Sequence, residues 1–235
     1  MPILDVWKAP QIGLRRVVRW KKYIGAEPDV RLQNALQHSH AITILGAMVA
    51  TEIQPYVKRK GMELDRGLLM TALAVHDLGE GETGKDTLYI DKSIEGDLEE
   101  YQAFLRRYKL SKKGPMFNYL HRAFLLQFAL ANPQNFPLSA RALMSGIAIT
   151  NRLEAMVFDV VERWDYVLYA VEQYYERGNE KILVQTLRHQ IPHLNRLSNE
   201  LPGFGEKIWT KEISIWATEL LKDCDGKYEE QKGEI

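Results

Sequence analysis

A histidine and an aspartate stand side by side at the end of an apolar segment. His76 and Asp77 follow Leu73 and Val75, and Gly79 comes soon after them. Neighbouring helical positions point about 100° apart, so both side chains can reach one point only at a helix end or a cavity rim. The partial negative charge of a helix C-terminus favours a cation there. The pair therefore indicates a divalent metal site, with a buried histidine beside a capping aspartate as the alternative.

A second histidine, His38, could also be a metal ligand. His38 lies in a segment over 32–60 and shares one helical face with Ile42, Leu45 and Val49. A histidine on the buried face of a helix needs a polar partner. It is either a satisfied core histidine or a metal ligand together with His76.

Composition and charge exclude several classes of protein. The 235 residues carry 31 Lys plus Arg and 31 Asp plus Glu, so no overall basic field exists for nucleic acid. A single cysteine, Cys224, excludes an intrachain disulfide and a cysteine-based zinc site. The start of the chain does not read as a signal peptide, and no run approaches about 18 apolar residues. We expect a cytoplasmic protein with neither membrane nor nucleic acid as a partner.

The elements that must position these residues are helices. The region over 14–24 is a short basic amphipathic segment, and Asp65 is the expected N-cap of the helix that leads to His76. Pro192 is expected to stop a helix over 181–190. Further helices are predicted over 32–60, 94–108, 117–131, 139–177 and 207–223, with a turn over 132–137. An aromatic run between Trp164 and Tyr175 is typical of core packing or of a homodimer surface, so a homodimer stays open.

The order and spacing of these motifs resemble the HD superfamily of metal-dependent phosphohydrolases, and more narrowly the bacterial 5'-deoxynucleotidases and related small HD nucleotidases. The similarity rests on short motifs in the order seen in that family, and it covers roughly 14–177. The motifs are Arg19-Trp20, His38-Ser39, His76-Asp77-Leu78-Gly79-Glu80 and Thr83-Gly84-Lys85-Asp86.

The resemblance implies a role for each matched residue. His38, His76 and Asp77 would hold one divalent ion, which is Mn²⁺, Co²⁺, Ni²⁺, Fe²⁺ or Zn²⁺, with Mg²⁺ also open. Glu80 would position or deprotonate the attacking water. The remaining implied roles are substrate binding by Arg19, Trp20 and Lys85, and a catalytic part for Asp77 and for Asp86, which is displaced by one residue from the family pattern.

The last metal ligand departs from the family pattern. Asn151 stands where the family has aspartate, and an amide oxygen is a weaker ligand for a hard cation than a carboxylate. Glu154 lies on the same helical face and is an alternative ligand. Three interpretations stay open: a weakened working site with Asn151, a site completed by Glu154, and a site that has lost catalysis.

From the resemblance we expect an all-α protein. An HD helical bundle over 1–178 would carry a C-terminal helical extension over 179–235. The implied activity is release of phosphate from a (deoxy)nucleoside monophosphate, a small-molecule phosphate ester, by a metal-bound water. The alternatives are hydrolysis of a nucleoside triphosphate or another small phosphomonoester, and a non-catalytic nucleotide-binding module.

Overall fold

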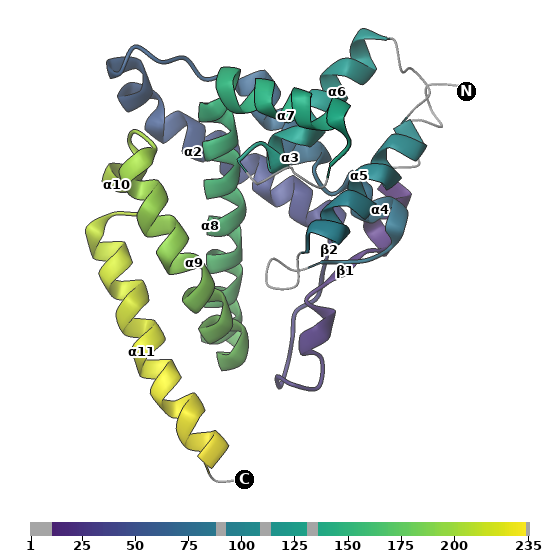
Figure 1. Ribbon diagram of the computed structural model, residues 1–235. Helices are drawn as coiled ribbons and strands as arrows, with labels where there is room; N and C mark the ends of the chain where they lie inside the picture. Colours follow the sequence, from purple (N-terminus) through teal and green to yellow (C-terminus); the bar gives the residue numbers. More distant parts are fainter. Residues whose placement is uncertain (1–10, 88–92, 109–113, 131–135, 234–235) are drawn as a thin grey trace. The chain divides into compact units, whose positions relative to one another are not determined.

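Apolar residues at helical spacing build an all-α protein, as the sequence predicts (Figure 1). The computed structural model describes residues 11–87, 93–108, 114–130 and 136–233. Within these residues, no helix combines the length and the apolar character that crossing a membrane requires.

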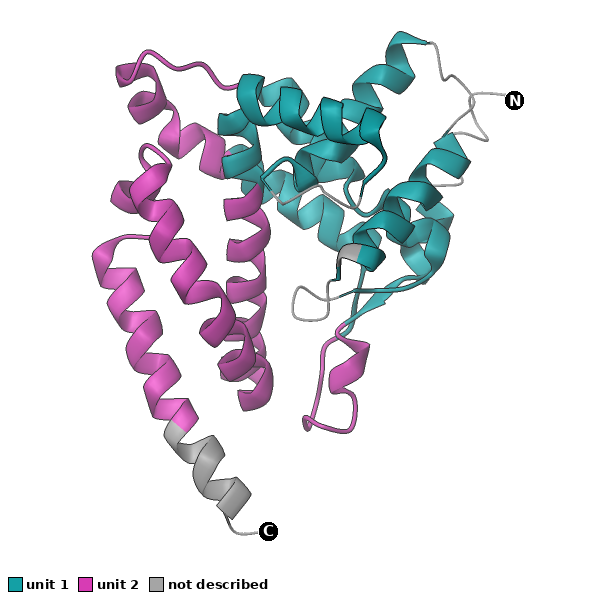
Figure 2. Ribbon diagram, in the orientation of Figure 1, with its two compact units in different colours: residues 1–19, 32–47, 65–158 teal, residues 20–31, 48–64, 159–235 magenta. Residues whose placement is uncertain are grey.

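The chain forms two compact units, drawn in different colours in Figure 2. Unit 1 comprises residues 1–19, 32–47 and 65–158, and unit 2 comprises residues 20–31, 48–64 and 159–235. The expected domain boundary after residue 178 lies inside unit 2.

The N-terminal part of unit 1 is not the single helical segment expected over 14–24. Residues 11–16 are helical, and strand β1 (Val18–Arg19) then pairs antiparallel with strand β2 (Gln33–Asn34). The β-branched pair Val17-Val18 favours extended backbone, which ends the helix early. Arg19 therefore lies on a strand and not on the expected helix.

Three helices carry the histidines and the aspartate. Helix α2 (Ala35–Arg59) continues through Pro55, and helix α3 (Arg66–Val75) begins after Asp65. The Asp65 side chain accepts a hydrogen bond from the Leu68 amide (2.9 Å), which confirms the predicted N-cap. Helix α4 (Leu78–Thr83) follows α3 after two residues.

The remaining helices of unit 1 pack around an aromatic core, in which the rings of Phe104 and Phe124 stack at 4.0 Å. The helix expected over 139–177 is instead two helices separated by Asn151. The turn expected over 132–137 lies largely outside the described residues. The elements are α5 (Ile94–Tyr108), α6 (Pro115–Leu125), η3 (Leu126–Phe128), α7 (Leu138–Thr150) and α8 (Arg152–Arg177), whose first residues belong to unit 1.

Unit 2 holds the C-terminal helices. Pro192 does not stop its helix, because Ile191, Leu194 and Leu197 on both sides of it are buried, and their packing outweighs one missing hydrogen bond. Its elements are η1 (Lys21–Tyr23), α9 (Glu180–Glu200), α10 (Phe204–Lys207) and α11 (Lys211–Gly233), which replace the helices expected over 181–190 and 207–223.

Two glycines with positive φ give a matched test of packing in unit 2. At Gly203 (φ 85°) an added Cβ would lie 2.8 Å from the Tyr56 ring, whereas at Gly178 (φ 71°) it would meet open space. Gly178→Ala should cost only the left-handed backbone penalty of about 1–2 kcal/mol. Gly203→Ala should cost about 1–3 kcal/mol more, because the ring must move.

Urea unfolding of both variants measures this difference. Equal midpoints for the two alanine variants would contradict the close contact between Gly203 and Tyr56.

Candidate metal centre

Three buried side chains of unit 1 converge on one point. One ligand atom each from His38, His76 and Asp77 lies within 4.8 Å of the other two. The three residues are 0%, 3% and 5% exposed. This arrangement agrees with the ligand set that the resemblance implies, and imidazole nitrogens with a carboxylate oxygen suit a divalent transition metal.

Two helix boundaries place these groups. His38 comes from the first turn of α2, whereas His76 caps the C-terminus of α3. Asp77 has non-helical backbone (φ −82°, ψ 3°) between α3 and α4. The break turns the chain at this point, so the adjacent His76 and Asp77 side chains both reach His38.

Neighbouring groups hold His76 in one orientation. Its Nδ1 lies 2.9 Å from the Leu73 carbonyl oxygen, so Nδ1 carries a proton and donates to it, while Nε2 faces the site. Gln127 on η3 donates to the His76 carbonyl (3.0 Å). The Phe158 ring packs edge-on against the imidazole at 5.6 Å.

Positive groups compensate the buried Asp77 carboxylate. His76 Nε2 lies 2.8 Å from Asp77 Oδ1, and Arg19 Nη1 lies 3.6 Å from Oδ2. Burial by itself would raise the pKa of Asp77, but His76, His38 and Arg19 outweigh it and hold that pKa below its usual range.

A proton or a metal ion must lie between His76 Nε2 and Asp77 Oδ1. Without either, Nε2 carries a lone pair and would repel the carboxylate oxygen at 2.8 Å, because both atoms are electron-pair donors. A proton on the imidazole or a bound metal ion meets this requirement. The donor set therefore fits a metal ion.

The predicted acidic residues differ in their surroundings. Glu80 is 3% exposed, and its Oε1 accepts a hydrogen bond from the Thr87 amide (3.3 Å). Asp86 lies 4.0 Å from Arg19 Nε, so Arg19 connects Asp86 to Asp77. The exposed Lys85 pairs with Glu99 at 3.2 Å.

Trp20, a predicted substrate-binding residue, belongs to unit 2. It is 1% exposed and stacks on Tyr169 with ring centroids 4.2 Å apart. Tyr166 meets the same indole edge-on at 5.9 Å. These contacts anchor Trp20 in the aromatic core of unit 2, and its role in substrate binding stays a prediction.

Both polar atoms of the Asn151 amide are engaged by other side chains. Its Oδ1 accepts a hydrogen bond from Arg122 Nη2, and its Nδ2 donates to Glu154 Oε2 (3.2 Å). Glu154 Oε1 in turn accepts from the Asp65 amide (2.5 Å), just before α3. His76 follows the last residue of that helix, whose 10 residues span about 15 Å.

Glu154 is therefore a structural carboxylate at the start of α3. It is 3% exposed and is not among the three residues that converge as possible metal ligands. Sequence spacing indicated neither this link nor the support of His76 by Gln127. Both depend on which helices pack together.

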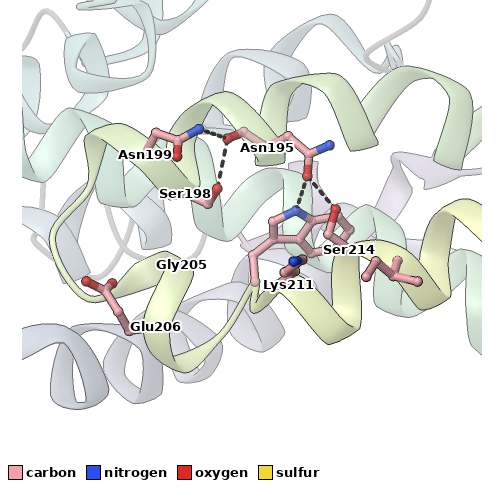
Figure 3. Close-up of a pocket in the computed structure, with 9 residues that line it drawn as sticks. Asn195, Ser198, Asn199, Gly205, Glu206, Lys211 and Ser214 are labelled. Carbon is pink, nitrogen blue, oxygen red and sulfur yellow. Dashed lines mark hydrogen bonds between the residues drawn. The ribbon is translucent and has the colours of Figure 1, made fainter.

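A separate cavity of about 420 Å³ lies in unit 2 (Figure 3). The Asn195 side chain is fixed there, because its Oδ1 accepts hydrogen bonds from Trp209 Nε1 (2.6 Å) and Ser214 Oγ (2.7 Å). Ser198 and Asn199 both donate to the Asn195 carbonyl. These polar groups are largely satisfied by one another, so they chiefly tie α9 to α11.

A double-mutant cycle can test the hydrogen bond between Asn151 and Glu154. Asn151→Asp should cost about 1–3 kcal/mol, because a carboxylate replaces the donor that Glu154 needs. Glu154→Gln should cost a similar amount, since the one oxygen of a glutamine amide cannot accept from both Asn151 Nδ2 and the Asp65 amide. Combining both changes moves the donor to position 154 and should restore most of the stability.

Thermal unfolding of the wild type, the two single variants and the double variant measures the coupling. If the effects of Asn151→Asp and Glu154→Gln simply add, the two side chains do not form the proposed donor–acceptor link.

Comparison of the chain with models of known protein families, with curated proteins and with solved structures finds no significant match.

Proposed function

We propose that this protein is a metal-dependent phosphohydrolase. The observation that carries the proposal is the convergence of His38, His76 and Asp77, all buried, with ligand atoms within 4.8 Å of one another. The sequence motifs predict the same three residues as ligands. A bound divalent ion would supply acidification of water and polarisation of a phosphoryl oxygen.

The protein's own residues would prepare the site for that ion. The Leu73 carbonyl and Gln127 orient His76, so its Nε2 lone pair faces the Asp77 carboxylate. Arg19 lies beside Asp77 and brings a fixed positive charge to the same place. A guanidinium group suits a phosphate, because its planar donors match the phosphate oxygens.

Glu80 would act on the attacking water. The Thr87 amide binds one oxygen of its carboxylate, which restricts how the group turns. A buried carboxylate with a fixed orientation can hold a water and accept its proton. Asp86, on the other side of Arg19, would keep the guanidinium in position.

The substrate class rests on the resemblance to HD nucleotidases. A (deoxy)nucleoside monophosphate is the leading substrate, with a nucleoside triphosphate or another small phosphomonoester as the alternatives. The non-catalytic nucleotide-binding module differs from all of these, because it does not require a metal.

The first test of the proposal is metal binding. His38→Ala should weaken Mn²⁺ binding at least about 10-fold in titration calorimetry, because it removes one of three ligands. His40→Ala is the matched control, since His40 lies two residues along the same helix and is exposed. Equal affinities for both variants would place the ion elsewhere, and no binding by the wild type would favour the nucleotide-binding module.

The second test is catalysis. Glu80→Gln keeps the shape of the side chain and removes its charge, so phosphate release from nucleoside monophosphates should fall about 10²- to 10⁴-fold. Mn²⁺ affinity should be retained. Glu82→Gln is the control, because Glu82 lies on the same helix and pairs with Arg107 at 3.4 Å.

Phosphate release is measured with a panel of nucleotides in Mn²⁺, Co²⁺ or Mg²⁺. Similar turnover in the Glu80→Gln and Glu82→Gln variants would remove Glu80 from the reaction.

A further inference from the structure

Arg122 is an exposed arginine whose guanidinium group is held by neutral acceptors. Its Nη2 donates to Thr150 Oγ1 (3.0 Å) and to Asn151 Oδ1, and both of these acceptors are neutral. Several other exposed arginines pair with carboxylates, namely Arg31 with Glu172, Arg188 with Asp225, and Arg196 with Glu200.

Neutral acceptors orient a guanidinium without cancelling its charge. Among the described residues, only Nη2 of Arg122 makes hydrogen bonds, so Nε and Nη1 still have N–H groups to donate. An aspartate at position 151 would form an ion pair instead. The amide therefore leaves Arg122 with a net positive charge and unused donors.

The support of Arg122 extends into the protein. Asn151 is only 8% exposed, and its Nδ2 is bound by the buried carboxylate of Glu154. Glu154 is itself fixed to the Asp65 amide (2.5 Å). This chain of hydrogen bonds fixes the donor end of an exposed side chain before any ligand binds, which lowers the entropic cost of binding.

We propose that Arg122 forms an anion-binding site that takes a phosphate group, and that Asn151 is a positioning residue for it. Phosphate fits, because its oxygens accept several N–H groups at once and its charge complements the guanidinium. Arg152, which follows Asn151 in the sequence, is also exposed and begins α8. This proposal does not depend on the metal centre or on hydrolysis.

The proposal explains why an amide stands at position 151. Its oxygen faces a guanidinium and its nitrogen faces a carboxylate, so neither a carboxylate nor an apolar residue satisfies both neighbours. Both polar atoms of Asn151 are thus engaged by Arg122 and Glu154.

The probe is inorganic pyrophosphate, titrated calorimetrically into metal-free protein at low ionic strength. Wild type should bind it, and Arg122→Gln should weaken binding at least about 10-fold, as expected for the loss of charge-assisted hydrogen bonds. Arg188→Gln is the control, because Arg188 is exposed and paired with Asp225. Its affinity should equal that of the wild type.

The combined variant Asn151→Asp/Glu154→Gln tests the role of the neutral amide. It preserves the donor–acceptor link but pairs Arg122 with a carboxylate, so it should lose pyrophosphate binding to the same extent as Arg122→Gln. Its Mn²⁺ affinity should stay at the wild-type value, whatever the outcome for hydrolysis.

Three results would overturn the proposal. These are no pyrophosphate binding by the wild type, equal binding by wild type and Arg122→Gln, and full binding by the combined variant. If the combined variant does not fold, Asn151→Ser is tested in its place. This change removes the hydrogen bond from Arg122 to the Asn151 amide without adding charge, so it should also weaken pyrophosphate binding.

Discussion

Burying the carboxylate of Asp77 is the constraint on which the centre of unit 1 depends. A buried negative charge is costly unless cations or hydrogen-bond donors compensate it. His76 and Arg19 lie beside this carboxylate, and the Ser39 hydroxyl lies 3.4 Å from Oδ2. Each of them comes from a different element, so strand β1, helix α2 and the end of helix α3 must meet at this point. The same need for positive charge makes the cluster suitable for a metal ion.

Both polar clusters of unit 1 occur where one helix ends and the next begins. His76 and Asp77 lie between α3 and α4, and Asn151 lies between α7 and α8. Where a helix ends, adjacent side chains no longer follow the helical spacing. Some backbone N–H and C=O groups there also lack partners within the helix. Glu154 uses one such group, the Asp65 amide before α3. Polar contacts therefore fix α3 at both of its ends.

The two clusters stabilise their charged groups in different ways. At the candidate metal centre, basic groups surround the Asp77 carboxylate and lower its pKa. At Asn151, a neutral amide separates the charges of Arg122 and Glu154 and bonds to both. An amide carries a donor and an acceptor on one group, which no carboxylate does above its pKa. Asparagine therefore suits position 151, because it bonds to both neighbours at once.

The sequence by itself determined the helical class, the Asp65 cap, and the choice of His38, His76 and Asp77, because periodicity, capping and ligand type are local properties. The helix break at Asn151 and the continuation of α9 through Pro192 could not be predicted, since packing between helices decides them. The early end of the first helix required a partner strand about 15 residues away. The supports of His76 and the contacts of Asn151 join residues distant in sequence, so only the tertiary structure could bring them together.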